Sequence, residues 1–528
     1  MSRYGELNSH KDDVYTRYPL TKMVCTIGPV SEDFETLQQC VSSGLRVMRM
    51  NFSHATFEEA NMRMTNLRKS KGFTGKNFNM RAVMLDTQGP EIRSGMLVGD
   101  PQHSTPKKKK MELVRGSTIT LTTNNEYKDK GTPDTLWISY TKLPQSVSIG
   151  GSILLDDGLV ELRVEEVLGG DVVCRVMNTA LLGERKGVNL PGCEVDLPAL
   201  TEKDKTDIRF GIENDIDFIA ASFVRKGSDV KDIKDFVEEV HAEFWPADHP
   251  VPGIISKVEN QEALKNFDDI MGESYGIMVA RGDLGVEIPF ENVTLAQKEM
   301  IYRCNQNGVP VIVATQMLES MQANPRPTRA EVSDVTNAVL DGADCVMLSG
   351  ESANGTYPVE SIRALGSIAV QADKHVAMIN EGRAATVSGS SPLMGSIKAL
   401  AYSAVRASQE LQAVCIIVMT STGKTAKYLS SFRPSVPIMA YIDNAKIGRQ
   451  LIMHRGVHPL YFKPDDAKQG TPDEAVRKAI EFGFCVSGDT VLILQSIEQD
   501  NGSHDVAMRI RKVSPDGSPE KNEKILKF

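Results

Sequence analysis

Eight short apolar runs, each closing on polar residues or glycine, constrain the fold of this chain more than any other feature. Helical patterns separate most of them, such as residues 31–44 and residues 292–308, and the second of these ends in glycine as helices often do. Continuous apolar strands that alternate with helices favour a closed (β/α)8 TIM barrel over an open sheet. The runs begin at Lys22, Leu45, Arg81, Ile216, Gly253, Gly276, Pro310 and Asp344.

A segment of different texture interrupts the alternation after the third run. Short alternating stretches separated by Gly and Asp-Gly turns predict an all-β barrel inserted in a βα loop, on the active-site face. Near the C-terminus, strand–helix alternation with fewer strands predicts a separate α/β domain. We therefore expect a polar lead-in (1–18), a discontinuous TIM barrel (19–90 and 199–376), an inserted β-barrel lid (91–198) and a C-terminal α/β regulatory domain (377–528).

Net charge, apolar run length and cysteine usage indicate which partners and which compartment to expect. The net charge of −9 and pI near 5.7 argue against nucleic acid or an anionic membrane. No apolar run approaches the ~18–20 residues of a membrane span, and the N-terminus has no signal-peptide core. The eight cysteines form no CxxC pair, and four lie inside strand-like runs, as buried thiols in a reducing compartment would. We expect a cytoplasmic protein.

Polar residues that follow the strands should meet at one face of the barrel. Arginine and lysine suit a phosphorylated ligand, because they neutralise its charge and donate hydrogen bonds. Glu259 and Asp283 offer the hard oxygen ligands that Mg²⁺ or Mn²⁺ prefers, with the other positions left to water and substrate. The full set is Arg49, Asn51, Ser53, His54, Asp86, Thr87, Arg93, Ser222, Lys257, Glu259, Asp283, Thr315, Ser349 and Glu351.

Plainer interpretations exist for single members of this set. Lys257 and Glu259 point the same way from a strand end and could form only an ion pair. Asp283 stands between glycine and leucine and could be a turn residue. The oxygens of four other residues suit either a monovalent cation or helix capping, and the residues alone leave both open. These four are Asn51, Ser53, Asp86 and Thr87.

Nine motifs, in the same order along the chain, closely resemble those of the pyruvate kinase family. The resemblance is dense over residues 18–368 and looser through the C-terminal part. The motifs are Lys22-MVCTIGP, Arg49-MNFSH, Asp86-TQGPEIR, Lys186-GVNLPG, Ile255-SKVEN, Met278-VARGDLGVEIP, Ala314-TQMLESM, Pro325-RPTRAEVSDV and Met347-LSGESANGTYP.

The resemblance implies an enzyme that transfers the phosphoryl group of phosphoenolpyruvate to ADP, giving pyruvate and ATP, the last step of glycolysis. Lys257 matches the family lysine that stabilises the enolate as the phosphoryl group departs. Arg49 matches the contact to the transferred phosphate, and Thr315 lies near the site of enolpyruvate protonation, whose proton donor stays open.

Binding roles follow from the same resemblance. Glu259 and Asp283 match the ligands of the divalent cation, and Glu91 resembles the glutamate typical of potassium-dependent members. The K⁺ ligands match Asn51, Ser53, Asp86 and Thr87. The substrate-binding set is Arg49, Ser222, Gly282, Asp283 and Thr315. The nucleotide-binding set is Asn51, Phe52, Ser53, His54, Arg93 and Lys186.

Three departures from the family pattern bear on cation dependence and on regulation. Gln88 stands where many potassium-dependent members have lysine, and Ser94 where many have threonine. The stretch Thr420-STGKT resembles the family's effector-phosphate loop, but the tryptophan and arginine that some members use for fructose 1,6-bisphosphate have no clear match. The expected effector residues are Thr420, Ser421, Thr422, Gly423, Lys424 and Thr425. A homotetramer is expected from the family.

Two other functions compete with this one. The first is another Mg²⁺-dependent phosphoenolpyruvate or oxoacid barrel, such as an aldolase-like lyase, against which the inserted β domain and the nucleotide contacts argue. The second is a catalytically silent sugar-phosphate sensor, which the presence of Lys257, Glu259, Asp283 and Thr315 disfavours.

Overall fold

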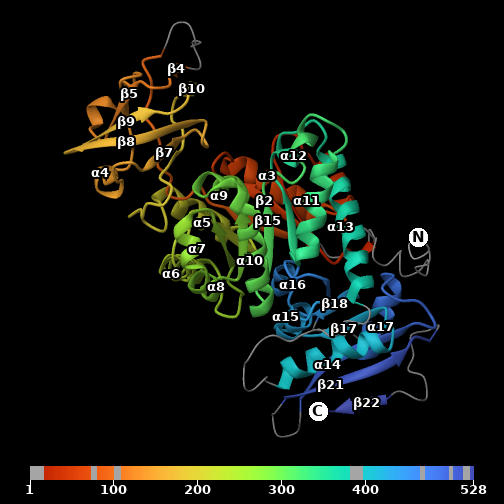
Figure 1. Cartoon of the computed structure of the whole chain (residues 1–528). Helices are drawn as coiled ribbons and strands as arrows, with labels where there is room; N and C mark the ends of the chain where they lie inside the picture. Colours follow the sequence, from red (N-terminus) through yellow and green to blue (C-terminus); the bar gives the residue numbers. More distant parts are fainter. Residues whose placement is uncertain are drawn as a thin grey trace.

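The computed structural model describes residues 17–72, 80–99, 109–380, 396–463, 470–498, 504–514 and 524–527. At its centre, eight parallel strands close into a barrel in the order β1-β16-β15-β14-β13-β12-β3-β2 (Figure 1). All eight predicted strands are present, which confirms the barrel. They are β1 (Lys22–Thr26), β2 (Val47–Asn51), β3 (Ala82–Asp86), β12 (Phe218–Ala221), β13 (Gly253–Val258), β14 (Gly276–Ala280), β15 (Val311–Ala314) and β16 (Cys345–Leu348).

The barrel helices pack on the outer faces of these strands. Three of them, α3, α5 and α11, begin with a capping box in which a threonine side chain and an acidic side chain satisfy each other's backbone N–H groups. The helices are α2 (Phe34–Ser42), α3 (Phe57–Lys69), α5 (Glu202–Glu213), α6 (Gly227–Phe244), α7 (Gln261–Lys265), α8 (Phe267–Glu273), α9 (Arg281–Glu287), α10 (Phe290–Asn307), α11 (Arg329–Asp341), α12 (Gly350–Ala353) and α13 (Pro358–Asn380).

The segment between β3 and α5 forms the predicted all-β module. Its six-stranded sheet has the order β11-β7-β8-β9-β5-β6, and β10 pairs separately with β4. The Asp-Gly turn between β7 and β8 places Asp156 and Asp157 in the left-handed region, at φ of 53° and 54°. The strands are β4 (Lys110–Leu113), β5 (Thr118–Thr122), β6 (Thr135–Trp137), β7 (Ser152–Leu155), β8 (Val160–Leu168), β9 (Asp171–Val176), β10 (Ala180–Gly183) and β11 (Val188–Asn189).

The C-terminal part is an α/β domain, as predicted, with one sheet in the order β19-β18-β17-β20-β21-β22. Strands β17 to β20 are parallel, and β21 and β22 add to the edge in antiparallel fashion. The elements are α14 (Ser396–Glu410), β17 (Cys415–Met419), α15 (Lys424–Ser431), β18 (Ile438–Ile442), α16 (Ala445–Leu451), β19 (Val457–Tyr461), α17 (Pro472–Glu481), β20 (Thr490–Glu498), β21 (His504–Lys512) and β22 (Lys524–Lys527).

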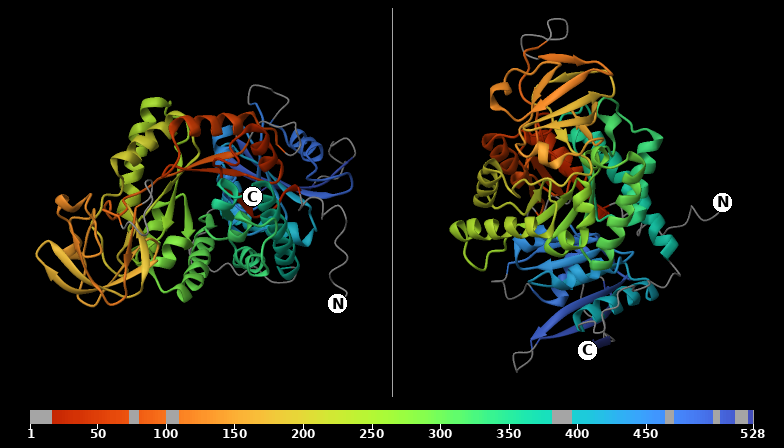
Figure 2. Two further views of the ribbon diagram at one scale, coloured as in Figure 1. Left: turned by 90° about the horizontal axis from the view of Figure 1, so that it is seen from above. Right: turned by 60° about the vertical axis from the view of Figure 1, so that its left-hand side comes forward.

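The C-terminal domain closes the floor of the barrel, where the strands begin. Met453 joins the buried apolar cluster inside the barrel. Beside it, Arg449 donates to Asp217 at 2.8 Å and to Asp215 at 2.7 Å, and Lys446 donates to Asp215 at 2.7 Å. These pairs fix the orientation of the C-terminal domain on the barrel, and removal of one partner would leave an unpaired buried charge at a cost of about 3–5 kcal/mol. The inserted β domain lies at the opposite end (Figure 2).

All eight cysteines are free thiols, as predicted, and only Cys193 is partly exposed. Across the described ranges, every helix is too short or too polar to span a lipid bilayer.

Candidate active site

Arg49 lies at the carboxyl end of β2, beside the end of β3. The parallel register sets Asn51 opposite Asp86. The guanidinium of Arg49 donates from Nε to Asp86 Oδ2 at 2.5 Å and from Nη1 to Thr26 Oγ1 at 2.8 Å. Burial alone would raise the pKa of Asp86, but the charges of Arg49 and Lys257 outweigh it and lower that pKa. An anionic aspartate thus aims a buried arginine at the rim of the barrel.

Lys257 projects from the end of β13 into a ring of oxygens. Its Nζ lies 2.8 Å from Ser222 Oγ, 3.2 Å from Asp86 Oδ1 and 2.8 Å from Glu259 Oε1. Burial would lower the pKa of Lys257, but Asp86 and Glu259 outweigh this and raise it. The ammonium therefore stays charged, and its position is fixed by three neighbours from β3, β12 and β13.

Glu259 and Asp283 supply the negative charge of the site. Glu259 is 1% exposed, and its Oε2 accepts a 2.5 Å hydrogen bond from the Phe223 backbone N–H. Its Oε1 accepts no hydrogen bond of regular geometry, although Lys257 Nζ is close by. Burial and the charge of Asp283 raise the pKa of Glu259 to about 8, against the opposing effect of Lys257. A bound cation would favour the ionised form of the buried Glu259 carboxyl.

The donor set fits a divalent cation that is held mainly by small ligands. Within the described residues, no group of three or more His, Cys, Asp or Glu side chains could hold a metal alone. Two carboxylates with one under-used oxygen match an octahedral cation that keeps water and substrate oxygens in its other positions. The residues present therefore fit Mg²⁺ or Mn²⁺ at Glu259 and Asp283.

The four residues predicted as K⁺ ligands lie together, and each also has a hydrogen bond. Asn51 Oδ1 accepts from the Ser53 N–H at 3.0 Å. Thr87 Oγ1 accepts from the Ser222 N–H at 3.1 Å and donates to a strand carbonyl. Asp86 is shared by Arg49 and Lys257. Backbone groups hold the side chains of Asn51 and Thr87, two cations hold that of Asp86, and several side-chain oxygens gather there.

Thr315 follows β15 in a strained conformation. Its φ is 69° and that of Gln316 is 54°, a region that costs a β-branched residue about 1–3 kcal/mol. The hydroxyl of Thr315 accepts from the Gly282 N–H at 2.8 Å and donates to the Ala314 carbonyl at 2.6 Å. The structure thus brings Thr315 and Gly282 together beside Asp283, as predicted.

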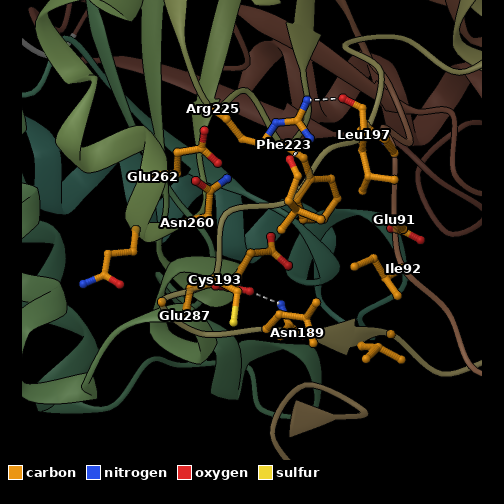
Figure 3. Close-up of a pocket in the computed structure, with 18 of the residues that line it drawn as sticks. Glu91, Ile92, Asn189, Cys193, Leu197, Phe223, Arg225, Asn260, Glu262 and Glu287 are labelled. Carbon is orange, nitrogen blue, oxygen red and sulfur yellow. Dashed lines mark hydrogen bonds between the residues drawn. The ribbon is translucent and has the colours of Figure 1, made fainter. Parts of the chain in front are cut away.

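A cavity of about 240 Å³ lies between the inserted domain and the barrel (Figure 3). Arg93 and Lys186 line it from the inserted domain, and Asp283 lines it from the barrel. Arg93 pairs with Glu91 at 2.6 Å, and Lys186 pairs with Asp156 at 2.9 Å. Burial and the nearby Asp283 raise the pKa of Asp157. The β7–β8 turn therefore brings its own carboxylates to the barrel rim.

One predicted rim residue, Glu351, differs from expectation. Glu351 is fully buried, and both of its oxygens accept backbone N–H groups, from Leu318 at 3.0 Å and Ser349 at 2.8 Å. It supports the loops and does not face the site. His54 is exposed on the loop after β2.

Sequence reasoning missed three residues that shape the site. Lys203 Nζ donates to the Phe52 carbonyl at 2.7 Å and so supports the loop that carries Ser53. Arg225 donates to two carbonyls of the segment that returns from the inserted domain, one of them Leu197 (Figure 3). Arg281 reaches across to the carbonyl of Thr315. From sequence, a basic residue near a strand end can be expected to bind a ligand. No local pattern shows whether its side chain donates to a backbone carbonyl of the protein or to a phosphate of the ligand.

The predicted effector loop lies in the C-terminal domain, apart from the barrel site. Gly423 has a φ of 74°, and its N–H donates to Thr420 Oγ1 at 3.0 Å. Lys424 begins α15, and the Ser421 hydroxyl donates to Asp443 at 2.7 Å. The loop has a cation and hydroxyls, with a carboxylate beside them.

Comparison with known proteins gives consistent matches. The family model described as "Pyruvate kinase, barrel domain" matches residues 18–362, and "Pyruvate kinase, alpha/beta domain" matches residues 398–510. The chain is 42% identical over 506 residues to pyruvate kinase PKLR of Homo sapiens, covering 94% of this chain and 85% of that protein. It is 43% identical over 507 residues to the cytosolic pyruvate kinase isozyme of Glycine max, covering 91% and 94%.

A solved structure agrees with these matches. A pyruvate kinase from Cryptosporidium parvum superposes with a TM-score of 0.84 at 38% sequence identity, covering 95% of this chain and 97% of that one.

Proposed function

The chain belongs to the pyruvate kinase family, and we propose which of its residues carry out the transfer of a phosphoryl group from phosphoenolpyruvate to ADP. It is a phosphotransferase of glycolysis that forms pyruvate and ATP. The observation that carries the assignment of roles is the ring of Arg49, Asp86, Lys257 and Glu259 at the ends of neighbouring barrel strands.

Lys257 and Arg49 neutralise the charge that moves during the transfer. Phosphoryl transfer needs positioning and electrostatic stabilisation more than covalent help from the protein. The Lys257 ammonium is held between two carboxylates, so it can stabilise the enolate oxygen as the bridging oxygen loses its phosphoryl group. Arg49, aimed by Asp86, binds the phosphoryl group itself.

The remaining residues hold substrate and cations. Glu259 and Asp283 would hold Mg²⁺ or Mn²⁺, and Asn51, Ser53, Asp86 and Thr87 would hold K⁺. When bound, these cations neutralise phosphate charge and orient the two substrates. Ser222, Gly282, Asp283 and Thr315 would hold the carboxylate end of phosphoenolpyruvate. The nucleotide would lie along Asn51, Phe52, Ser53, His54, Arg93 and Lys186, with Lys203 supporting the loop.

We propose that residues 91–198 act as a lid on a barrel made of residues 19–90 and 199–376. Residues of the lid and of the barrel line the cavity between them. Closure of the lid would exclude water that competes for the phosphoryl group. Residues 377–528 would form the regulatory domain.

A coupled assay for pyruvate tests the function directly. With phosphoenolpyruvate, ADP, Mg²⁺ and K⁺, we expect ADP-dependent formation of pyruvate, and omission of either cation should reduce it. A chain that releases phosphate from phosphoenolpyruvate without making ATP, or that binds sugar phosphates with no turnover, would contradict the assignment. Family membership disfavours both the lyase and the silent sensor.

The contact between Asn189 and Glu287 joins the lid to the barrel at 2.8 Å (Figure 3). Glu287 is partly buried and lines the cavity, so this hydrogen bond to a carboxylate is worth about 1.5 kcal/mol, the low end of the range for bonds to charged groups. Asn189→Ala should raise KM for ADP about tenfold, since each 1.4 kcal/mol is a factor of ten, and should change kcat less. Steady-state kinetics measure both. Glu165→Gln, in an exposed ion pair on the lid, is the control and should leave both constants unchanged.

Regulation by a sugar phosphate at Thr420 to Thr425 is a further proposal. The hydroxyls, the Lys424 side chain and the α15 N-terminus suit a phosphate, although Asp443 must be displaced from Ser421. Saturation curves for phosphoenolpyruvate with sugar phosphates or AMP would identify the effector. If no such compound shifts the saturation curve for phosphoenolpyruvate, in the native chain or in Lys424→Ala, this effector site is wrong.

We also propose a cytoplasmic homotetramer. Helix α10 exposes large apolar side chains, with Leu295 64% and Tyr302 56% exposed, and their spacing of seven places them on one face. Light scattering should give the mass of four chains, and Leu295→Glu should lower it. A native chain that is monomeric at micromolar concentration contradicts the proposal. Two plant relatives carry "cytosolic isozyme" in their names, and fractionation of cells tests the location here.

A further inference from the structure

We propose that Arg281, held by Asp334, is a positioning residue that frees the Thr315 hydroxyl to act during the protonation of enolpyruvate. The idea rests on the proposed function, in which Thr315 contacts the substrate. Neither Arg281 nor Asp334 has a role in the binding sets described above.

The turn that carries Thr315 needs support, because two successive residues are in the left-handed region. Arg281 provides it from the first position of α9. Its Nη2 donates to the Thr315 carbonyl at 2.6 Å, and its Nε lies 3.2 Å from the same oxygen. A planar guanidinium with several N–H groups can hold such a turn, whereas an ammonium cannot match that geometry.

The hydrogen bonds of Thr315 show why a second donor matters. A hydroxyl has one proton to donate, and that of Thr315 goes to the Ala314 carbonyl at 2.6 Å. If the hydroxyl turns to the substrate, or to the water that protonates it, Ala314 loses this bond. Ala314 is fully buried, so loss of this bond would be costly unless another group donates to the same carbonyl.

Arg281 Nε supplies that alternative donor. It lies 3.2 Å from the Ala314 carbonyl oxygen, which therefore has two donors in the resting structure. When the Thr315 proton leaves, the Arg281 bond remains. The Gly282 N–H still donates to the Thr315 oxygen at 2.8 Å, so the hydroxyl can rotate about a fixed oxygen. The Thr315 oxygen can therefore stay in place while its hydroxyl proton points either to the Ala314 carbonyl or to the substrate.

Asp334 and Gln297 fix the guanidinium from the other side. Arg281 Nη1 donates to Asp334 Oδ1 at 2.8 Å and lies 3.4 Å from Gln297 Oε1, and Gln297 is 2% exposed. These partners belong to α11 and α10. The orientation of the Thr315 turn is therefore set by two barrel helices as well as by its own strand.

The proton step itself is simple to balance. Water or an acid gives a proton to C3 of enolpyruvate, the electron pair of the C2–C3 double bond forms the new C–H bond, and the enolate oxygen becomes the carbonyl oxygen of pyruvate. A misdirected Thr315 hydroxyl should slow this step more than phosphoryl transfer. The solvent deuterium isotope effect on kcat reports that difference, because it grows when proton transfer limits turnover.

The test compares Arg281→Met, Arg281→Lys and Asp334→Asn in the full-length enzyme with Mg²⁺ and K⁺. We expect Arg281→Met to lower kcat about 10- to 100-fold, Asp334→Asn about tenfold or less, and both to show a larger solvent isotope effect than the native chain. KM for ADP should not change. Arg281→Lys should not rescue activity. The matched controls are Asp341→Asn on the same helix as Asp334, in a partly exposed ion pair, and Arg303→Met on α10, in an exposed one.

Three outcomes overturn the proposal. The first is an unchanged kcat in Arg281→Met. The second is a lower kcat with an unchanged isotope effect in both variants, which is the result of a merely structural role. The third is native kcat in Thr315→Val, which also removes the assumed role of Thr315. Should Arg281→Met fail to fold, Asp334→Asn decides, since it keeps the arginine and its carbonyl contacts. If the native chain forms pyruvate from phosphoenolpyruvate and ADP, the proposed function holds, and any of these three outcomes contradicts only the role given to Arg281 or Thr315.

Discussion

Lys257→Met should lower kcat at least about 10³-fold while the fold stays intact. The ammonium is the cation best placed to stabilise the enolate oxygen, and Ser222, Asp86 and Glu259 hold it in place at 2.8, 3.2 and 2.8 Å. Removal of a single oxyanion donor in other enzymes costs about 10²–10³, and here a full charge is lost as well. The coupled pyruvate assay, run at saturating substrate, measures the effect.

The buried carboxylates around Lys257 complicate this experiment, so stability must be followed too. Asp86 keeps its 2.5 Å contact to Arg49, whereas Glu259 loses its ion pair. Breaking a buried pair on one side costs about 3–5 kcal/mol, and a bound divalent cation would offset part of it. Thermal unfolding with and without Mg²⁺ separates loss of fold from loss of chemistry. Lys298→Met, in an exposed pair, is the control and should retain native kcat. Substantial activity in folded Lys257→Met means that another group stabilises the enolate.

The barrel was predictable because its strands are buried on both faces. Each therefore reads as a continuous apolar run, such as that of β13. The gathering of Arg49, Asp86 and Lys257 at one rim followed from the same topology. The edge of the C-terminal sheet was harder, because β21 alternates charged and apolar residues and pairs antiparallel with β20, without the helix that marks a parallel crossover.

The parts of the site that could not be predicted depend on long-range geometry. Nothing local to Thr315 signals a φ of 69°, since the strain is offset by contacts from Arg281, more than thirty residues away in sequence. Glu351 was assigned to the rim because it follows a strand, yet its carboxylate turns inward to two backbone N–H groups. Lys203 is an ordinary helix-surface lysine in sequence, and only the fold brings it to the Phe52 carbonyl.

Glu259→Gln should weaken Mn²⁺ binding about 100-fold or more and lower kcat by at least a similar factor. The amide keeps an oxygen that can accept the Phe223 N–H, so the loop should hold its shape, but the charge that a divalent cation requires is gone. Electron paramagnetic resonance of free Mn²⁺ measures affinity without any need for turnover. Kinetics across a range of Mg²⁺ concentrations then show whether excess metal restores activity.

The design of this last experiment depends on a second glutamate close to Glu259 in sequence. Glu262 lies three residues after Glu259 and lines the cavity between lid and barrel. Burial raises its pKa, and the opposing charge is that of Arg225, whereas Glu259 is opposed by Lys257. Glu262→Gln should therefore keep Mn²⁺ affinity within about threefold, because the metal would be held by Glu259 and Asp283. Equal losses in the two variants would place the cation deeper in the lid cavity. Loss in Glu259→Gln alone, with recovery of kcat at high Mg²⁺, ties the chemistry to the pair at the ends of β13 and β14.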